Sequence, residues 1–392
     1  MKKIFALLLA ALMVLSMAAC GGQEPASEQG ADFKVCVMTP TLSWSEDQYR
    51  AGEEMVAKYP GIVEHLTLPD DFAAEQETGI TQIMNIAKNP EYKALVICYG
   101  DSGILPAIQM AKAENPNLVI VTAPVWDDPY EMADVIDLCI DANWEKRGEV
   151  IANKAHEMGA ERIIHYSFPT HLSMEEVAQR RETMKVTAEA LGMEFIDVTM
   201  PDPYVTPDSA ANQFVQEDIP KQIEKYGEDT CIFSTYCPTQ DFVIGLALEY
   251  KYIVAEQCCP TPTQGYPAGM NLEITEDIAG DYDAINAMIS EVAAEHGVTG
   301  RLSTWPVSMG AFQPEFATEA AVRSLMGEME LTDTQALIEL ASEVAGVPVE
   351  IELLDGVYEN YVLYIMDSFY YYFSCVCCGT KVSQHIAVFD RI

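Results

Sequence analysis

Short, uninterrupted runs of apolar residues alternate with amphipathic helical patterns along most of this 392-residue chain. In its first part, strands are expected at 33–38, 63–68, 94–99, 118–122 and 135–140. Helical patterns occur at 45–59, 75–87, 106–114 and 144–158. Strands that are apolar throughout and separated by helices are typical of a parallel sheet covered on both faces.

The same alternation starts again after Gly159. Strands are expected at 162–166, 194–198, 230–235 and 252–257, with helices from 173 and at 210–226, 242–250 and 281–296. Two such runs predict an α/β protein with two Rossmann-like lobes, 32–159 and 160–300, each with a parallel sheet and joined by a hinge of several segments. Residues 303–345 are expected to complete the first lobe, and the placement of 346–392 is left open.

The first residues have the pattern of a targeting signal. Lys2 and Lys3 precede an apolar run, 4–19, that is shorter than a comfortable membrane span. The small residues before Cys20 resemble a bacterial lipobox, which implies removal of 1–19 and lipid attachment to the Cys20 sulfur. Residues 20–31 then form a flexible tether, and the protein is extracytoplasmic, held at the cell membrane by its lipid alone. Ordinary secretion is the alternative.

The chain is strongly acidic, with a formal net charge of −39. This argues against nucleic acid as a partner and against a surface that lies on anionic lipid. The eleven cysteines include no repeated C-x-x-C, and no histidine pair stands at zinc spacing, so neither a metal nor a cofactor is expected. Cys258 and Cys259 are adjacent, and a disulfide between them would be strained, so free thiols are expected; a redox or metal pair is the alternative.

The segment 165–184 combines a polar, aromatic loop with a helix that carries two arginines. Ser173 and Glu176 have the spacing of a capping box, which predicts a helix start at Ser173. Val177 and Met184 begin an apolar stripe, and Arg181 falls on it. Because a buried guanidinium needs an anion or several acceptors, Arg181 is a candidate ligand contact. An ion pair with a carboxylate inside the fold is the alternative.

In open α/β sheets, ligands bind at the carboxyl ends of the strands. Polar and aromatic side chains follow the strands of both runs, and aromatic rings can stack on sugars or bases. The candidate ligand-binding residues are Thr41, Trp44, Tyr99, Asp101, Trp126, Asp141, Asn143, His165, Ser167, Arg180, Arg181, Asp202, Tyr236, Gln257 and, where the chain recrosses the hinge, Trp305. Each has a structural alternative: a tryptophan can cap a lobe edge, His165 can be a satisfied core residue, and Asp202 can be a turn residue.

The segments VMTPTLSWSEDQYRAGE (37–53), MGAERIIHYSFPTHLSMEEVAQRRETM (158–184) and AEQCCPTPTQGYP (255–267) carry a family resemblance. The chain from Asp32 to Arg323 resembles the type I periplasmic-binding-protein fold of the lipid-anchored solute receptors of ABC importers. More narrowly, it resembles a family of uncharacterised bacterial lipoproteins with that fold. The resemblance implies a hinged protein that closes on a small solute and hands it to an ABC permease.

Some positions can be carried over from the sugar-binding branch of that fold. There, Trp44 matches a stacking aromatic, Asp141 an acceptor of hydroxyl groups, and Arg180 or Arg181 an arginine on the first helix of the second lobe. Gln257 ends a strand where another polar contact usually lies. The glycine-rich aspartate loop of sugar binders is replaced by residues 257–260 (QCCP), which argues against a simple monosaccharide.

No nucleophile elbow, H-E-x-x-H, P-loop or dinucleotide-binding motif stands in a supporting context, so an enzyme is not expected. The predicted function is capture of a small polar ligand, such as a sugar or nucleoside, for an ABC importer. The alternatives are a cell-surface enzyme that uses cysteine and histidine, and a surface scaffold or sensor without a transport role.

Overall fold

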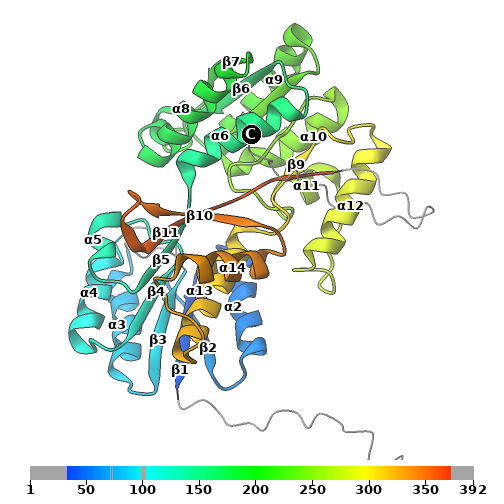
Figure 1. Ribbon diagram of the computed structural model, residues 1–392. Helices are drawn as coiled ribbons and strands as arrows, with labels where there is room; N and C mark the ends of the chain where they lie inside the picture. The colour runs from blue at the N-terminus through cyan, green and yellow to red at the C-terminus, as the bar shows by residue number, and fades with distance from the viewer. Residues whose placement is uncertain (1–32, 71, 73, 99–102, 372–392) are drawn as a thin grey trace, which may run out of the picture. The chain divides into compact units, whose positions relative to one another are not determined.

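The computed structural model describes residues 33–70, 72, 74–98 and 103–371. The predicted signal peptide, Cys20 and its tether, the candidates Tyr99 and Asp101, and the tail from Cys375 lie outside these residues. From Lys34 onward the described residues belong to one compact unit. It contains two mostly parallel sheets with their helices, which confirms the predicted α/β class (Figure 1).

The first sheet has seven strands in the order β10-β11-β5-β4-β3-β1-β2. Their bounds are β1 Lys34–Thr39, β2 Val63–Thr67, β3 Tyr92–Ile97, β4 Val119–Thr122, β5 Leu138–Ala142, β10 Val349–Leu354 and β11 Tyr358–Met366. All neighbours are parallel except β10 and β11. Part of the segment 346–392, whose placement the sequence left open, therefore becomes β11, which pairs with β5 and extends the sheet.

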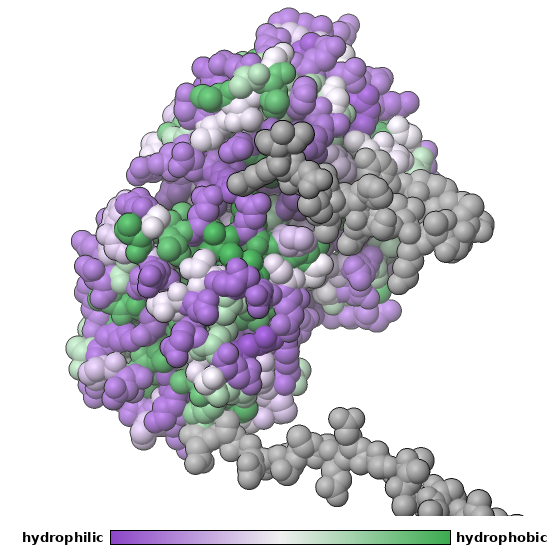
Figure 2. Space-filling model, in the orientation of Figure 1, coloured by the Kyte–Doolittle hydropathy of each residue, from purple (hydrophilic) through white to green (hydrophobic). Residues whose placement is uncertain are grey.

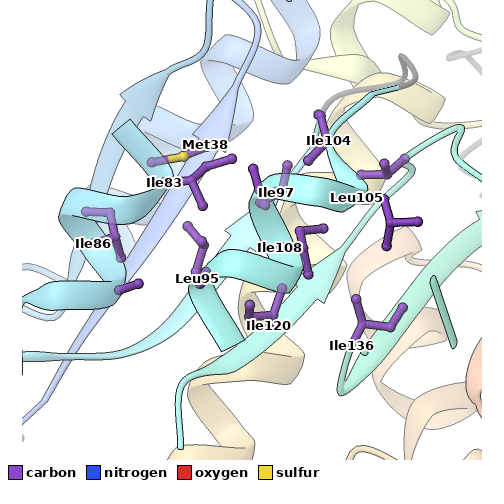
Figure 3. Close-up of a cluster of buried hydrophobic side chains, with 14 of the residues drawn as sticks. Met38, Ile83, Ile86, Leu95, Ile97, Ile104, Leu105, Ile108, Ile120 and Ile136 are labelled. Carbon is purple, nitrogen blue, oxygen red and sulfur yellow. The ribbon is translucent and has the colours of Figure 1, made fainter. Parts of the chain in front are cut away.

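Helices cover both faces of this sheet. They are α2 Glu46–Lys58, α3 Gln76–Lys88, α4 Leu105–Glu114, the short α5 Pro129–Ala133, α13 Met309–Leu325 and α14 Thr334–Ala345. Leu95 and Ile97 of β3 pack with Ile83 of α3 and Ile108 of α4 in one buried cluster (Figure 3). α13 packs on α2 and on β1, β3 and β4. Figure 2 shows hydrophilic residues over most of the visible surface, in keeping with the acidic composition.

The second sheet has the order β7-β6-β8, and its strands are all parallel. β6 is Arg162–Ser167, β7 Glu194–Thr199 and β8 Thr230–Ser234. Isolated bridges then join Cys231 to Ile253 and Val254 to Leu302, so the expected strand at 252–257 is only a short extended segment. Next to it lie β9 Ser303–Thr304 and, antiparallel to β9, β12 Phe369–Tyr370.

The helices of the second sheet also lie on both of its faces. They are α6 Trp144–Glu157, α7 Pro169–Leu172, α8 Glu175–Ala190, α9 Asp208–Tyr226, α10 Gln240–Tyr250, α11 Tyr266–Met270 and α12 Tyr282–Glu295, with a 3₁₀ turn at Cys237–Thr239. Ile219 of α9, Val243 of α10 and Ile285 of α12 share one core cluster with Tyr166. Within the described residues, no helix combines the length and the apolar composition that crossing a membrane requires.

The structure places α6 on the second sheet, whereas the sequence assigned it to the first lobe. Its apolar residues Ile151 and Ala155 pack with Ile163 of β6 and Met184 of α8. The chain therefore passes from the first sheet to the second between Ala142 and Trp144, well before Gly159. Two further crossings follow β9 and β11. The reason is the apolar stripe of α6, which is buried against α8 and β6.

The predicted capping box is wrong. Ser173 donates its hydroxyl proton to the carbonyl of Thr170, at 2.6 Å, and does not cap the next helix. Pro169–Leu172 forms a helix of its own, so Ser173 serves as its C-terminal cap. α8 therefore begins at Glu175 and follows Met174, which makes no side-chain cap.

Candidate functional site

The adjacent residues Arg180 and Arg181 of α8 lie in different environments. Arg180 is 1% exposed, whereas 22% of the Arg181 side chain is accessible. Arg181 pairs with Asp197 of β7, with its Nε 2.8 Å from Oδ1. Of the two interpretations of Arg181, the structure therefore shows the second: an ion pair with a carboxylate within the fold. His165 and Arg181 both face Asp197 and hold the pKa of that carboxyl well below its usual range.

Arg180 is a buried cation whose guanidinium is surrounded by two aromatic rings and the sulfur of a cysteine. Its Nη1 and Nη2 donate to the carbonyl and to the Sγ of Cys258, at 3.3 and 3.4 Å. The rings of Trp144 and Phe233 lie 5.5 and 5.2 Å from the guanidinium. Among the described residues, no carboxylate forms an ion pair with Arg180, and its Nε is buried without a hydrogen-bond partner. A buried N–H of this kind costs free energy until an acceptor reaches it.

Arg147 of α6 also contacts Cys258, but its charge is neutralised by a carboxylate and its N–H groups have acceptors. It forms a buried ion pair with Glu256, whose other oxygen accepts from Ser368 at 2.7 Å. It also donates to the carbonyls of Gln257 and Cys258, at 3.1 and 3.0 Å. The carbonyl of Cys258 thus accepts from both arginines, which fixes the chain at the end of the extended segment.

Asp141, the last residue but one of β5, lies next to the same group through its neighbour Trp144. Its carboxyl accepts from the backbone N–H of Ala142 at 2.7 Å, and the side chain of Trp144 lies next to it. Burial raises the pKa of Asp141 to about 7. Trp144 therefore neighbours Asp141, and the face of its ring lies over the Arg180 guanidinium. This places a hydrogen-bond acceptor, an aromatic face and an unpaired donor in one arrangement.

A second group of candidates lies around an open hollow of about 650 Å³ beside α8, lined in part by His165, Ser167, Arg181 and Asp197. His165 stacks on Phe233, with ring centroids 5.8 Å apart, and burial lowers the pKa of its imidazole. Its Nδ1 is 3.5 Å from Asp197, beyond a good hydrogen bond. The Ser167 hydroxyl is engaged with that of Thr235, at 2.9 Å.

Several candidates already have partners within the fold. Asn143 caps α6 by accepting from the N–H of Lys146 at 3.0 Å. Gln257 donates to the carbonyls of Thr261 and Gln264 and accepts from Thr304. Asp202 accepts from the backbone of Thr170 and Tyr204, as a turn residue does. The Thr41 hydroxyl donates to Asp70 at 2.7 Å.

The aromatic candidates divide by exposure. Trp44 and Trp126 are 61% and 54% exposed and are available at the carboxyl ends of β1 and β4. Trp305 is fully buried, with its ring 5.9 Å from that of Tyr364 and 5.4 Å from the Arg147 guanidinium. Tyr236 packs edge-on against Phe168.

Sequence reasoning missed Arg147, Phe233 and the contribution of Trp144 as the link between the arginine and Asp141. A signal for Arg147 was present, because it precedes Ile151 by four residues on the apolar stripe of α6. The argument applied to Arg181, that a charge on an apolar stripe needs a partner, applies to Arg147 as well.

A family model described as Protein of unknown function (DUF3798) matches residues 33–303. A protein from Clostridium difficile 630, described as a candidate transcriptional regulator, has a crystal structure that is 33% identical in sequence, with a TM-score of 0.82 over 87% of this chain and 99% of that one. An uncharacterised protein of Treponema pallidum (strain Nichols) is 28% identical over 200 residues, covering 47% of this chain and 89% of the relative.

More distant structures share the fold. The substrate-binding protein of a sugar ABC transport system from Bordetella parapertussis 12822 is 13% identical, with a TM-score of 0.51 over 86% of this chain and 88% of that one. A sugar ABC transporter protein from Actinomyces odontolyticus ATCC 17982 is 12% identical, with a TM-score of 0.52 over 76% and 85%. The predicted periplasmic-binding-protein-like fold is confirmed.

Proposed function

Since this chain belongs to the DUF3798 family and has the fold of periplasmic binding proteins, we propose that it is a solute-binding protein that captures a small polar ligand. The ligand has hydroxyl or amine groups and an acceptor oxygen or nitrogen, as sugars, nucleosides and related solutes do. In this proposal the protein is attached to the membrane by its lipid, lies outside the cytoplasm and binds the ligand without changing it chemically. It then transfers the ligand to an ABC permease.

The observation that carries this proposal is the unpaired Nε–H of Arg180, buried near the ring of Trp144, which is also a neighbour of Asp141. A buried donor without a partner is rare in folded proteins and costs about 1–3 kcal/mol. A ligand acceptor would satisfy it, the face of Trp144 would cover an apolar face of the ligand, and the Asp141 carboxyl would accept from a hydroxyl or amine. Each group thus recognises a different part of one small solute.

The adjacent arginines supply a matched test. The protein is screened by thermal shift against sugars, nucleosides, amino acids and polyamines, together with the variants Arg180→Gln and Arg181→Gln. A ligand at 100 times its Kd adds about 2.7 kcal/mol of stability, and lobes of this size gain about 2–4 °C per kcal/mol. We expect a hit that Arg180→Gln abolishes and Arg181→Gln retains, because the Nε–H of Arg180 is buried and unpaired whereas that of Arg181 is bonded to Asp197.

The variant Arg180→Lys keeps a charge at this position and reports on folding if Arg180→Gln is unstable. An equal shift in the parent and in both Arg180 variants would place the ligand elsewhere. A well-folded protein that no polar solute stabilises at millimolar concentration would contradict the proposed function.

A further inference from the structure

Three cysteines converge at one edge of the second sheet. Cys237 begins the 3₁₀ turn after β8, and Cys258 and Cys259 follow the extended segment that ends near Gln257. That segment runs beside β8, because the backbone N–H of Ile232 donates to the carbonyl of Ile253 at 2.9 Å. Two parallel neighbours end at the same edge, which brings the three thiols together from positions about twenty apart in sequence.

The spacing of the sulfurs suits a single ion. All three Sγ atoms lie within 4.8 Å of one another, and those of Cys237 and Cys259 are 3.5 Å apart. A tetrahedral ion with Zn–S bonds of about 2.3 Å needs sulfurs about 3.8 Å apart, whereas a disulfide needs about 2.05 Å. The arrangement therefore requires small adjustments to hold an ion and a larger movement to form a disulfide.

The local charges favour a divalent ion. Three thiolates and one divalent cation carry a net charge of −1. Arg180 supplies the compensating charge, since its Nη2 donates to Cys258 Sγ, while Arg147 is already neutralised by Glu256. A monovalent ion would leave an additional negative charge in a buried place, and a trivalent ion would leave Arg180 uncompensated.

The surroundings also support a bound ion. Arg180 donates from Nη2 to the Sγ of Cys258 at 3.4 Å, and a cation beside a thiol favours the thiolate, which is the form that ligates metals. The contacts of Arg147 and Arg180 with the Cys258 carbonyl fix the orientation of this ligand. Cys237 and Cys259 are partly exposed, so an ion can enter.

We propose that Cys237, Cys258 and Cys259 bind one divalent thiophilic ion, of the class of Zn²⁺ and Cd²⁺, as three thiolates with a fourth position open to water or a small ligand. Binding displaces the remaining thiol protons to solvent and involves no change of oxidation state. The inference goes beyond the proposed solute-binding function and does not rest on it, because the thiols and not the Arg180 Nε–H hold the ion. The sequence predicted no metal, since no recognised ligand spacing joins Cys237 to Cys258.

The test uses the reduced protein with Cys375, Cys377 and Cys378 changed to serine, so that these three thiols cannot contribute. Cd²⁺ is titrated while the thiolate-to-metal charge-transfer absorption is recorded, and Zn²⁺ is added in competition. We expect one Cd²⁺ per chain, displaced by Zn²⁺. In Cys259→Ser the Cd²⁺ affinity falls by more than about 10-fold. In Arg180→Gln it falls by about 10- to 100-fold, the range expected when a residue that orients a metal ligand is removed.

Cys98→Ala is the matched control, because Cys98 is a buried cysteine of the first sheet and, among the described residues, belongs to no group that could hold a metal. The Cd²⁺ affinity of this variant should equal that of the parent. Unchanged binding in Cys259→Ser, or no charge-transfer band in the folded parent, would overturn the inference. So would a Cys237–Cys259 disulfide, found by mass spectrometry of protein purified without reductant, that excludes the ion. These outcomes are independent of the solute screen, which measures a different ligand.

Discussion

Gly148 of α6 controls how closely this helix approaches α8. A Cβ atom at this position would lie 2.1 Å from Thr183 Oγ1, 2.2 Å from the carbonyl oxygen of Arg180 and 2.8 Å from the backbone nitrogen of Met184. Two of these atoms belong to the backbone of α8 and cannot rotate away. The substitution Gly148→Ala must therefore push the two helices apart, although alanine is the better helix former.

The sign of the change follows from two opposing contributions. Alanine in place of a helical glycine contributes about 1 kcal/mol of stability. Overpacking of a buried contact costs about 1–3 kcal/mol, and contacts with backbone atoms belong at the upper end. The net loss is about 2 kcal/mol, which lowers the Tm of a unit of 150–250 residues by about 4–8 °C.

Differential scanning calorimetry of the parent and of Gly148→Ala measures this shift. Gly245→Ala on α10 is the control, because its Cβ would first meet a backbone oxygen at 3.2 Å and needs only a small adjustment. We also expect Gly148→Ala to weaken Cd²⁺ and solute binding, since Arg147 and Arg180 reach Cys258 from the two helices that it separates. A Tm at or above that of the parent would refute the reasoning, because helix propensity would then outweigh the contact.

Two other substitutions test the electrostatics of the second sheet. Glu256→Gln leaves the buried Arg147 without its counter-charge and should lower the free energy of unfolding, measured with urea, by about 3–5 kcal/mol. Glu352→Gln, in an exposed pair with Lys146, should lower it by less than about 1 kcal/mol. Equal losses in the two variants would contradict this. Burial lowers the pKa of His165, so the stability it contributes is present above its unfolded pKa of about 6.5 and is lost as the pH falls below that value. His165→Phe should therefore reduce the loss of unfolding free energy between pH 7 and pH 5, and an unchanged slope would show that other groups cause it.

The fold was predictable because burial on both faces leaves a strong local pattern. The runs 33–38 and 94–99 are apolar at nearly every position, and they correspond to β1 and β3, which both have a strand on either side in the first sheet. The pattern weakens where a strand is short or irregular. The segment 252–257 begins with four apolar residues, as a strand does, but it forms only isolated bridges, in which Ile253 pairs with Cys231 and Val254 with Leu302.

The site depends on packing between elements that the local pattern does not contain. Neighbouring residues of a helix point about 100° apart, so a small error in the position of the buried stripe exchanges Arg180 for Arg181. The packing of α6 on α8 decides between them, because the line it covers is Arg180, Met184 and Ala188.

The thiol cluster has the same origin. Cys237 and Cys258 each follow an apolar run directly, but only the parallel pairing of the segment at Ile253 with β8 brings those two ends together. Neither residue has a partner within a few positions in sequence that would complete a familiar ligand motif. Both the unpaired donor of Arg180 and the converging sulfurs therefore arise from the same two contacts, α6 on α8 and β8 on the extended segment, and a substitution that loosens either contact should impair solute and metal binding together.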